Sequence, residues 1–156
     1  MATTVDPSGT KPETPDPAPA MILGHGIDLV DTARIARLMS DHDDRFLDRV
    51  FTAGERAYCD GGGKNRLQRY AARFAAKEAV LKVLGTGWSG GIAWTDVEVL
   101  KDPGGRPCVA LHGEAAAIAS GLGITRWHLS LSHLPDHALA SAIGEGEYEG
   151  ASTDPA

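Results

Sequence analysis

The sequence lacks any apolar run long enough to cross a membrane, and it lacks the pattern of a secretory signal. No stretch reaches the roughly 18 consecutive apolar residues of a membrane span. Residues 1–20 have no basic start followed by an apolar block. Cysteine is scarce, since Cys59 and Cys108 are the only two. Two isolated cysteines without zinc spacing are typical of free thiols in a reducing compartment, so we expect a cytoplasmic protein.

The composition is that of an ordinary globular domain with loose ends. The 156 residues are 42% hydrophobic and 23% charged, which suits one domain of normal size. Residues 1–20 are mostly Pro, Thr, Asp and Ala and cannot bury enough apolar surface to offset their ordering entropy. We therefore predict a disordered N-terminal extension at 1–20, a folded domain at 21–144 and a flexible acidic tail at 145–156.

The net charge of −6 is concentrated at the two ends of the chain. Residues 1–20 hold one lysine against three acidic groups, and residues 145–156 hold four acidic groups, so residues 21–144 are neutral. Within this neutral body, residues 45–82 carry nine Lys or Arg against four Asp or Glu. This surplus indicates either a site for an anion or a solvated helix face.

The first half of the folded part predicts a strand followed by helices. MILGHGIDLV at 21–30 suits a buried strand, and Asp31-Thr32 can cap the helix that follows. We expect SDHDD at 40–44 to interrupt that helix. Thr52 and Glu55 fit a capping box that opens a short helix. An apolar stripe from Leu67 to Leu81 then predicts a long helix that ends at Gly85.

The second half predicts mainly strands. Residues 92–100 and 108–111 flank the turn KDPGGRP, which indicates a hairpin. Residues 114–120 form an alanine-rich helix. Residues 127–133 alternate between apolar and polar side chains and can pair with residues 138–143. Helices first and hairpins later indicate an α+β fold with a largely antiparallel sheet.

Two carboxylates lie where apolar residues are expected. Glu78 interrupts the apolar stripe in RFAAKEAVLKVLGTG, and Asp28 lies inside an apolar strand. A buried, unpaired carboxylate is costly. Glu78 could simply pair with Lys82 four residues later, and Asp28 could be a satisfied buried aspartate. Together, however, they could bind a hard cation such as Mg²⁺, which usually shares its coordination shell with substrate phosphates.

Three segments in this order, HGIDLVDTARIARL, RFAAKEAVLKVLGTG and HLSLSH, resemble the holo-[acyl-carrier-protein] synthases of the 4′-phosphopantetheinyl transferase superfamily. The resemblance covers residues 21 to about 144. It implies the transferase-like α+β fold, with one copy of an antiparallel sheet packed on a long central helix. It also implies the reaction: coenzyme A donates phosphopantetheine to a serine of an apo acyl carrier protein, and 3′,5′-ADP leaves. The carriers serve fatty-acid or polyketide synthesis.

The resemblance assigns roles to the unusual residues. It implies that Asp28 and Glu78 bind Mg²⁺, or Mn²⁺ in its place, and that Lys82 contacts the reacting phosphate. Glu78 or a metal-bound water takes the serine proton. The residues that it implies for coenzyme A are Arg73, Lys77, Gly85, Thr86, Gly87, Ser132 and His133.

The family also implies partners. The helix after Asp28 docks the acidic helix of the carrier protein, through Arg34, Arg37 and Arg45 in this sequence. Three acidic groups, Asp41, Asp43 and Asp44, lie among these arginines and depart from the pattern. The short members resembled here are trimers with sites at subunit interfaces, so we expect a homotrimer. We expect no nucleic acid and no membrane as partners.

Three other functions remain to be distinguished from the transferase. A non-enzymatic coenzyme A-binding module would not need either carboxylate. A Mg²⁺-dependent pyrophosphohydrolase would cleave coenzyme A without a protein acceptor. A pure carrier-binding protein would need neither Mg²⁺ nor coenzyme A.

Overall fold

We describe residues 19–147 of a computed structural model of the protein, without the side chain of Asp43. Most of the predicted extension, residues 1–18, and most of the predicted tail, residues 148–156, lie outside this range. Among the described residues, none of the helices has the length and apolarity that a bilayer crossing requires.

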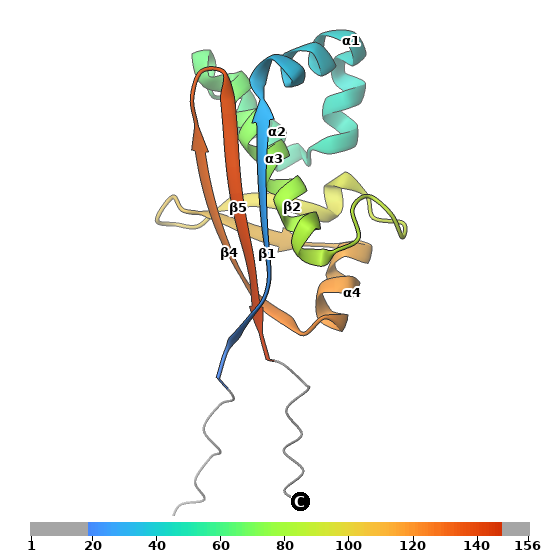
Figure 1. The fold of residues 1–156 in the computed structure, drawn as a ribbon. Coiled ribbons are helices and arrows are strands. Elements are labelled where there is room, and N and C mark those ends of the chain that lie inside the picture. Colours follow the sequence, from blue (N-terminus) through green and yellow to red (C-terminus); the bar gives the residue numbers. More distant parts are fainter. Residues whose placement is uncertain (1–18, 148–156) are drawn as a thin grey trace, which may run out of the picture.

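Three long antiparallel strands form the main sheet (Figure 1). They are β1 (Met21–Asp31), β5 (His137–Gly146) and β4 (Ile124–His133), in that spatial order. The strand β5 therefore lies between the other two, which confirms the predicted pairing of the last two strands. The predicted tail boundary is wrong, because Glu145 and Gly146 belong to β5, and Glu145 forms ion pairs with β4.

A hairpin of β2 (Val97–Lys101) and β3 (Pro107–Leu111) forms a second sheet, as the turn sequence predicts. The first of these strands begins later than expected, because residues Trp94–Asp96 form a 3-10 turn. The Asp96 carboxylate closes this turn by accepting a 3.1 Å hydrogen bond from the amide of Ala93. Helix α4 (Gly113–Gly121) then leads into β4.

The long helix α3 (Arg66–Leu84) packs across the main sheet and ends at Gly85, whose φ of 73° is left-handed, as predicted. Small residues let the helix and sheet approach closely. A Cβ on Gly26 would lie 2.0 Å from the carbonyl oxygen of Ala79, and one on Gly24 would lie 2.8 Å from Val83. The side of β5 that faces the helix presents only alanine and glycine. This contact brings β1, and with it Asp28, close to the helix that carries Glu78.

Helices α1 (Thr32–Val50) and α2 (Ala53–Asp60) cover one end of α3 (Figure 1). Asp31 and Thr52 cap them as predicted. The prediction that SDHDD interrupts the first helix is wrong, since α1 is continuous through it. An aspartate inside a helix lowers the stability of the helix by only about 0.7 kcal/mol relative to alanine. Packing of Leu47 in the core and ion pairs from Asp44 and Asp48 to Arg56 offset that cost.

Candidate functional site

The antiparallel register of β1 on α3 places Asp28 beside the part of the helix that carries Glu78. Gly24 faces Val83, and Gly26 faces Ala79. A strand advances about 3.3 Å per residue and a helix about 1.5 Å. Two residues beyond Gly26, Asp28 therefore reaches the turn of α3 that contains Glu78. The two carboxylates that the sequence marks as anomalous thus lie at one junction of strand and helix.

The predicted partner of Glu78 binds the other carboxylate instead. Lys82 Nζ lies 3.0 Å from Asp28 Oδ1 and donates a 2.6 Å hydrogen bond to the carbonyl oxygen of Ile27. Glu78 Oε1 accepts a 3.2 Å hydrogen bond from the indole nitrogen of Trp88. A simple Glu78–Lys82 ion pair is therefore not what holds Glu78. The site combines two carboxylates, one ammonium group and one indole.

This junction has the chemistry of a magnesium site. Within residues 19–147, hydrogen bonds occupy only one oxygen of each carboxylate, which leaves Asp28 Oδ2 and Glu78 Oε2 available. No three or more His, Cys, Asp or Glu side chains in that range are clustered so that they could hold a metal ion by themselves. Two carboxylate oxygens with the remaining positions open are what Mg²⁺ uses when water and substrate phosphates complete its shell. The residues present therefore fit this ion.

Lys77 does not lie where the resemblance implies. Its side chain is fully buried, and its Nζ lies 2.8 Å from Glu55 Oε2. It also donates hydrogen bonds to the carbonyl oxygens of Trp94 and Val97. Burial lowers the pKa of Lys77 below its usual range, and the negative charge of Glu55 acts against that shift. A contact with coenzyme A would require this ion pair to open, so the structure gives Lys77 a structural role instead.

A basic cavity of about 340 Å³ lies between α3, the β2–β3 hairpin and β4. The cationic and ionisable side chains that line it are those of Tyr58, Arg69, Arg73, Lys101, Arg106 and His133. Burial acts to raise the pKa of Tyr58. The hydrogen bond and charge of Lys101 and the charges of Arg69 and Arg73 outweigh that effect and lower it. A phenol with a lowered pKa reports a positive potential, which suits an anion.

Arg73 is the most deeply placed cation of this cavity. It is 4% exposed, and its guanidinium lies 3.9 Å from the centre of the Tyr58 ring. Its Nε is buried and has no hydrogen-bond partner among the described residues. A buried N–H group without a partner is costly, and a bound phosphate oxygen would satisfy it. This supports the predicted role of Arg73 in holding the nucleotide.

The carboxylate junction and the basic cavity lie on opposite sides of α3. A helix makes a full turn in about 3.6 residues, so the nine residues from Arg73 to Lys82 correspond to about two and a half turns. The two groups also lie on opposite edges of the main sheet, because Asp28 is on the edge strand β1 and His133 is on the opposite edge strand β4. Within one chain, the two groups of predicted site residues are therefore separated by the helix and by β5.

The remaining predicted coenzyme A residues lie on exposed surfaces. Gly85 and Gly87 have φ angles of 73° and 56°, with open space where a Cβ would lie. Between them, the Thr86 hydroxyl donates a 3.1 Å hydrogen bond to the carbonyl oxygen of Gly87. Ser132 is exposed on β4, opposite Leu139 of β5. The glycine backbone at the end of α3 is accessible, which would permit the close approach of a ligand that the resemblance implies.

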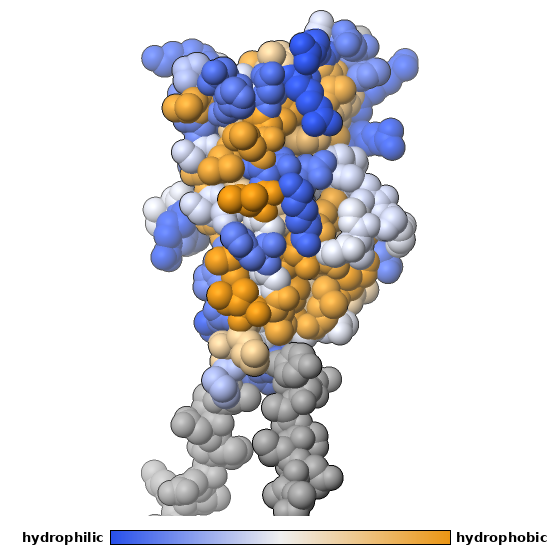
Figure 2. All heavy atoms as spheres, in the orientation of Figure 1, coloured by the Kyte–Doolittle hydropathy of each residue, from blue (hydrophilic) through white to orange (hydrophobic). Residues whose placement is uncertain are grey.

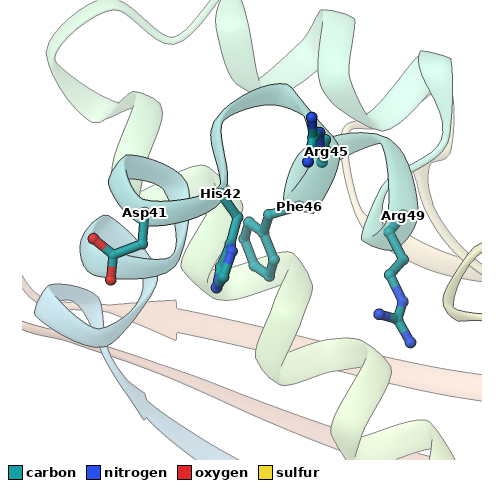
Figure 3. A pocket seen from close by; sticks show the side chains of 5 residues that line it. All are labelled: Asp41, His42, Arg45, Phe46 and Arg49. Carbon is teal, nitrogen blue, oxygen red and sulfur yellow. The ribbon is translucent and has the colours of Figure 1, made fainter.

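The predicted docking arginines are exposed along α1. Arg34 lies 5.7 Å from the centre of the Phe74 ring, and Arg45 helps to line a surface hollow of about 390 Å³. Figure 3 shows that His42 and Phe46 project side by side from this helix, with Asp41 and Arg49 on either side. The surface therefore joins an aromatic centre to charges of both signs.

Sequence reasoning missed three features of the site. Glu55 was assigned only to a capping box, which is present, but its second oxygen accepts a hydrogen bond from the amide of Val99 in the core. Trp88 lies in a glycine-rich segment and belongs to no helical or strand pattern of apolar residues, so nothing in the sequence marked it as a site residue. Lys101 and Arg106 flank the hairpin turn. Two basic residues so close together in the sequence were the available signal that this turn contributes to an anion site.

Comparisons with known proteins place the chain among close relatives. The sequence profile of the 4′-phosphopantetheinyl transferase superfamily matches residues 24–141. A holo-[acyl-carrier-protein] synthase of Koribacter versatilis is 52% identical over 125 residues, which are 80% of this chain and 99% of that protein. A holo-[acyl-carrier-protein] synthase of Desulforudis audaxviator is 51% identical over 129 residues, which are 83% of this chain and 97% of that protein.

Solved structures agree with the sequence comparisons. The crystal structure of a holo-[acyl-carrier-protein] synthase from Neisseria meningitidis superposes with a TM-score of 0.72 at 34% identity, covering 80% of this chain and 98% of that one. The corresponding protein from Bacillus anthracis, crystallised in complex with coenzyme A (3′,5′-ADP), superposes with a TM-score of 0.67 at 33% identity. That match covers 81% of this chain and 99% of that one.

Proposed function

This chain belongs to the 4′-phosphopantetheinyl transferase superfamily, and from that premise we propose how its residues carry out the reaction. It is a transferase that moves 4′-phosphopantetheine from coenzyme A to a serine of an apo acyl carrier protein. The family membership and the α+β fold carry this assignment. The observation that carries the proposed mechanism is the contact of Lys82 with Asp28 across α3 and β1, with Glu78 one helical turn before Lys82.

Asp28 and Glu78 hold Mg²⁺ in this proposal, and Mn²⁺ can take its place. The two free carboxylate oxygens support it, because they are hard ligands on adjacent rigid elements. When bound, the ion draws charge from the pyrophosphate oxygens and so stabilises the leaving group. Asp28 lies 3.0 Å from Lys82 Nζ, which holds the ammonium group beside a carboxylate that would bind the ion.

In the transfer step, the serine oxygen of the carrier forms a bond to the β-phosphorus of coenzyme A. The bond from that phosphorus to the bridging oxygen breaks, and 3′,5′-ADP leaves with the electron pair. Lys82 is 51% exposed and has an ammonium N–H beyond those used by Asp28 and Ile27, so it can donate to the reacting phosphate. In this proposal the serine proton passes either to Glu78 or to a water molecule held at the carboxylate junction.

The basic cavity holds the nucleotide and its 3′-phosphate. Its four Lys and Arg side chains, the unpartnered Nε of Arg73 and the lowered pKa of Tyr58 support this assignment. The cavity and the carboxylate junction lie on opposite sides of α3. One coenzyme A molecule therefore uses the junction of one chain and the cavity of a neighbouring copy.

We propose a homotrimer that unites these two half-sites. The face of the main sheet turned away from α3 carries Ile27, Leu29 and Leu139, which are 53%, 64% and 37% exposed. Figure 2 shows apolar side chains among polar ones over the side of the molecule on which Figure 1 shows β1 and β5. Large exposed apolar side chains on one sheet face are typical of a surface that associates.

The carrier docks on α1 in this proposal. Arg34, Arg37 and Arg45 are exposed there, and their charges suit an acidic helix. We place the reaction in the cytoplasm, where the free thiols of Cys59 and Cys108 persist.

Intact-mass measurement of an apo acyl carrier protein tests this function. The carrier is incubated with the protein, coenzyme A and Mg²⁺, and in parallel with EDTA or with the Glu78→Ala variant. A mass gain of one phosphopantetheine that disappears in both controls is expected. Cleavage of coenzyme A without a carrier product would instead support the pyrophosphohydrolase. Coenzyme A binding without any turnover, in a folded protein offered several carriers, would support the binding module.

A further inference from the structure

Trp88 contacts the carboxylate on which the reaction depends. Its indole nitrogen donates a 3.2 Å hydrogen bond to Glu78 Oε1. An indole N–H can only donate, and an ionised carboxylate can only accept, so the bond has a fixed direction. It occupies one oxygen of Glu78 and leaves the second oxygen available.

The indole of Trp88 is itself held in place by stacking. Its ring lies on that of Trp94, with centroids 3.4 Å apart and planes 29° apart. The ring of Trp94 stacks in turn on Phe74, with centroids 4.9 Å apart. Phe74 is a core residue of α3, one turn before Glu78. Helix α3 therefore carries Glu78 itself, and through the stacked rings of Phe74 and Trp94 it also holds the indole of Trp88 that binds Glu78.

The buried ion pair fixes the middle of this stack. The fully buried ammonium group of Lys77 donates a 3.1 Å hydrogen bond to the carbonyl oxygen of Trp94 and pairs with Glu55. Backbone and ring of Trp94 are thus both anchored to α3. The Trp88 segment is otherwise rich in glycine, with Gly87, Gly90 and Gly91 all at positive φ. A stack of rings anchored in the core gives this segment a defined position.

We propose that Trp88 is a positioning residue that orients the Glu78 carboxylate for the metal ion. The inference rests on the proposed function, in which Glu78 is a metal ligand. Hydrogen bonds to metal-binding carboxylates orient the ligand, and their loss typically weakens metal affinity about 10- to 100-fold. The indole N–H then holds one oxygen of Glu78 and leaves the other free for the ion.

Substitution of Trp88 by phenylalanine tests this role, since it keeps an aromatic ring for the stack and removes the N–H donor. The probe is Mn²⁺ in the presence of coenzyme A, with free Mn²⁺ counted by electron paramagnetic resonance. Trp88→Phe is expected to weaken Mn²⁺ binding about 10- to 100-fold while thermal unfolding without metal stays the same. The matched control is Trp127→Phe, the same change in β4 beside α4, which is expected to bind Mn²⁺ as the original protein does.

The Glu78→Gln variant distinguishes the proposed role of Glu78 as a metal ligand from the proposed role of Trp88. If Glu78→Gln binds Mn²⁺ as tightly as the original protein, the proposed function of Glu78 fails, and the role of Trp88 fails with it. If Glu78→Gln loses the ion but Trp88→Phe binds it normally, the role of Trp88 alone is wrong. An equal loss in Trp88→Phe and Trp127→Phe would also overturn it, because the indole N–H would not be the cause.

A second measurement serves if Trp88→Phe does not fold. In the Trp94→Phe/Trp127→Phe variant, Trp88 is the only tryptophan of the chain. Mn²⁺ is paramagnetic and quenches nearby indole emission. We expect quenching at the Mn²⁺ concentrations that support turnover, and none after the further change Glu78→Gln. Emission that is unaffected by bound Mn²⁺ would place Trp88 away from the ion and contradict the proposal.

Discussion

At the scale of single residues, Lys77 and Lys82 show how two lysines of one motif take different roles. Lys82 is half exposed and contacts Asp28, whereas Lys77 is fully buried with Glu55. Five residues separate them, about 140° around a helix, so they cannot face the same surroundings. The motif as written in sequence gives no indication of which lysine points into the core. Packing of α2 and the β2–β3 hairpin on α3 decides it.

Substitution of Lys77 by methionine is expected to affect folding rather than coenzyme A binding. It leaves the Glu55 carboxylate buried without its cation, which costs about 3–5 kcal/mol of unfolding free energy. Urea denaturation measures this loss. The double variant Lys77→Met/Glu55→Gln removes both charges and is expected to recover part of it. The KM for coenzyme A of the folded variant should be unchanged. A raised KM for coenzyme A with normal stability would show instead that Lys77 contacts coenzyme A.

At the scale of secondary structure elements, local sequence predicted most helices and strands, and tertiary contacts decided the exceptions. The cap at Thr52 and the stop at Gly85 depend on neighbouring residues only, so they were predictable. The continuity of α1 through SDHDD was not predictable, because it depends on Arg56 of the next helix binding Asp44 and Asp48. The same ion pairs turn these two acidic groups toward α2.

This arrangement leaves Asp41 beside the docking arginines. Asp41 and Arg45 are four residues apart and line the same hollow (Figure 3). An acidic carrier helix would meet the like charge of Asp41 there. We therefore expect the docking surface of this chain to attract its carrier less strongly than an uninterrupted arginine stripe.

Charge changes on α1 are expected to alter carrier binding and not the chemical step. Arg45→Glu should raise the KM for the carrier about fivefold, as expected for a surface charge worth about 1 kcal/mol. Asp41→Asn should lower it. Both effects should shrink as salt is added, because salt screens exposed charges. Steady-state kinetics with varied carrier and varied NaCl measures this. Lys64→Glu, an exposed charge reversal outside α1, is the matched control. A changed kcat with an unchanged KM would place Arg45 in the chemistry instead.

At the scale of the whole molecule, the predicted site residues are divided in space within one chain. Sequence spacing placed Arg73, Glu78 and Lys82 on one helix, and the resemblance placed all of them in one site. Only the fold shows that Arg73 faces the cavity beside β4 while Glu78 and Lys82 face the side of β1. The cations from the hairpin, Lys101 and Arg106, enter the cavity through tertiary structure. Their closeness in sequence indicates a basic turn, but it does not indicate which cavity that turn faces.

The division of the site gives the central claim its most direct test. Glu78→Gln removes the carboxylate half-site, and Arg73→Met removes the deepest cation of the cavity half-site. Each variant alone should fail to load an apo carrier in the intact-mass assay. If one coenzyme A spans two copies, mixed trimers contain some sites with both halves intact, so mixing the variants after reversible dissociation should restore a phosphopantetheine mass gain. Two folded, inactive variants that stay inactive after proven subunit exchange would contradict the shared site.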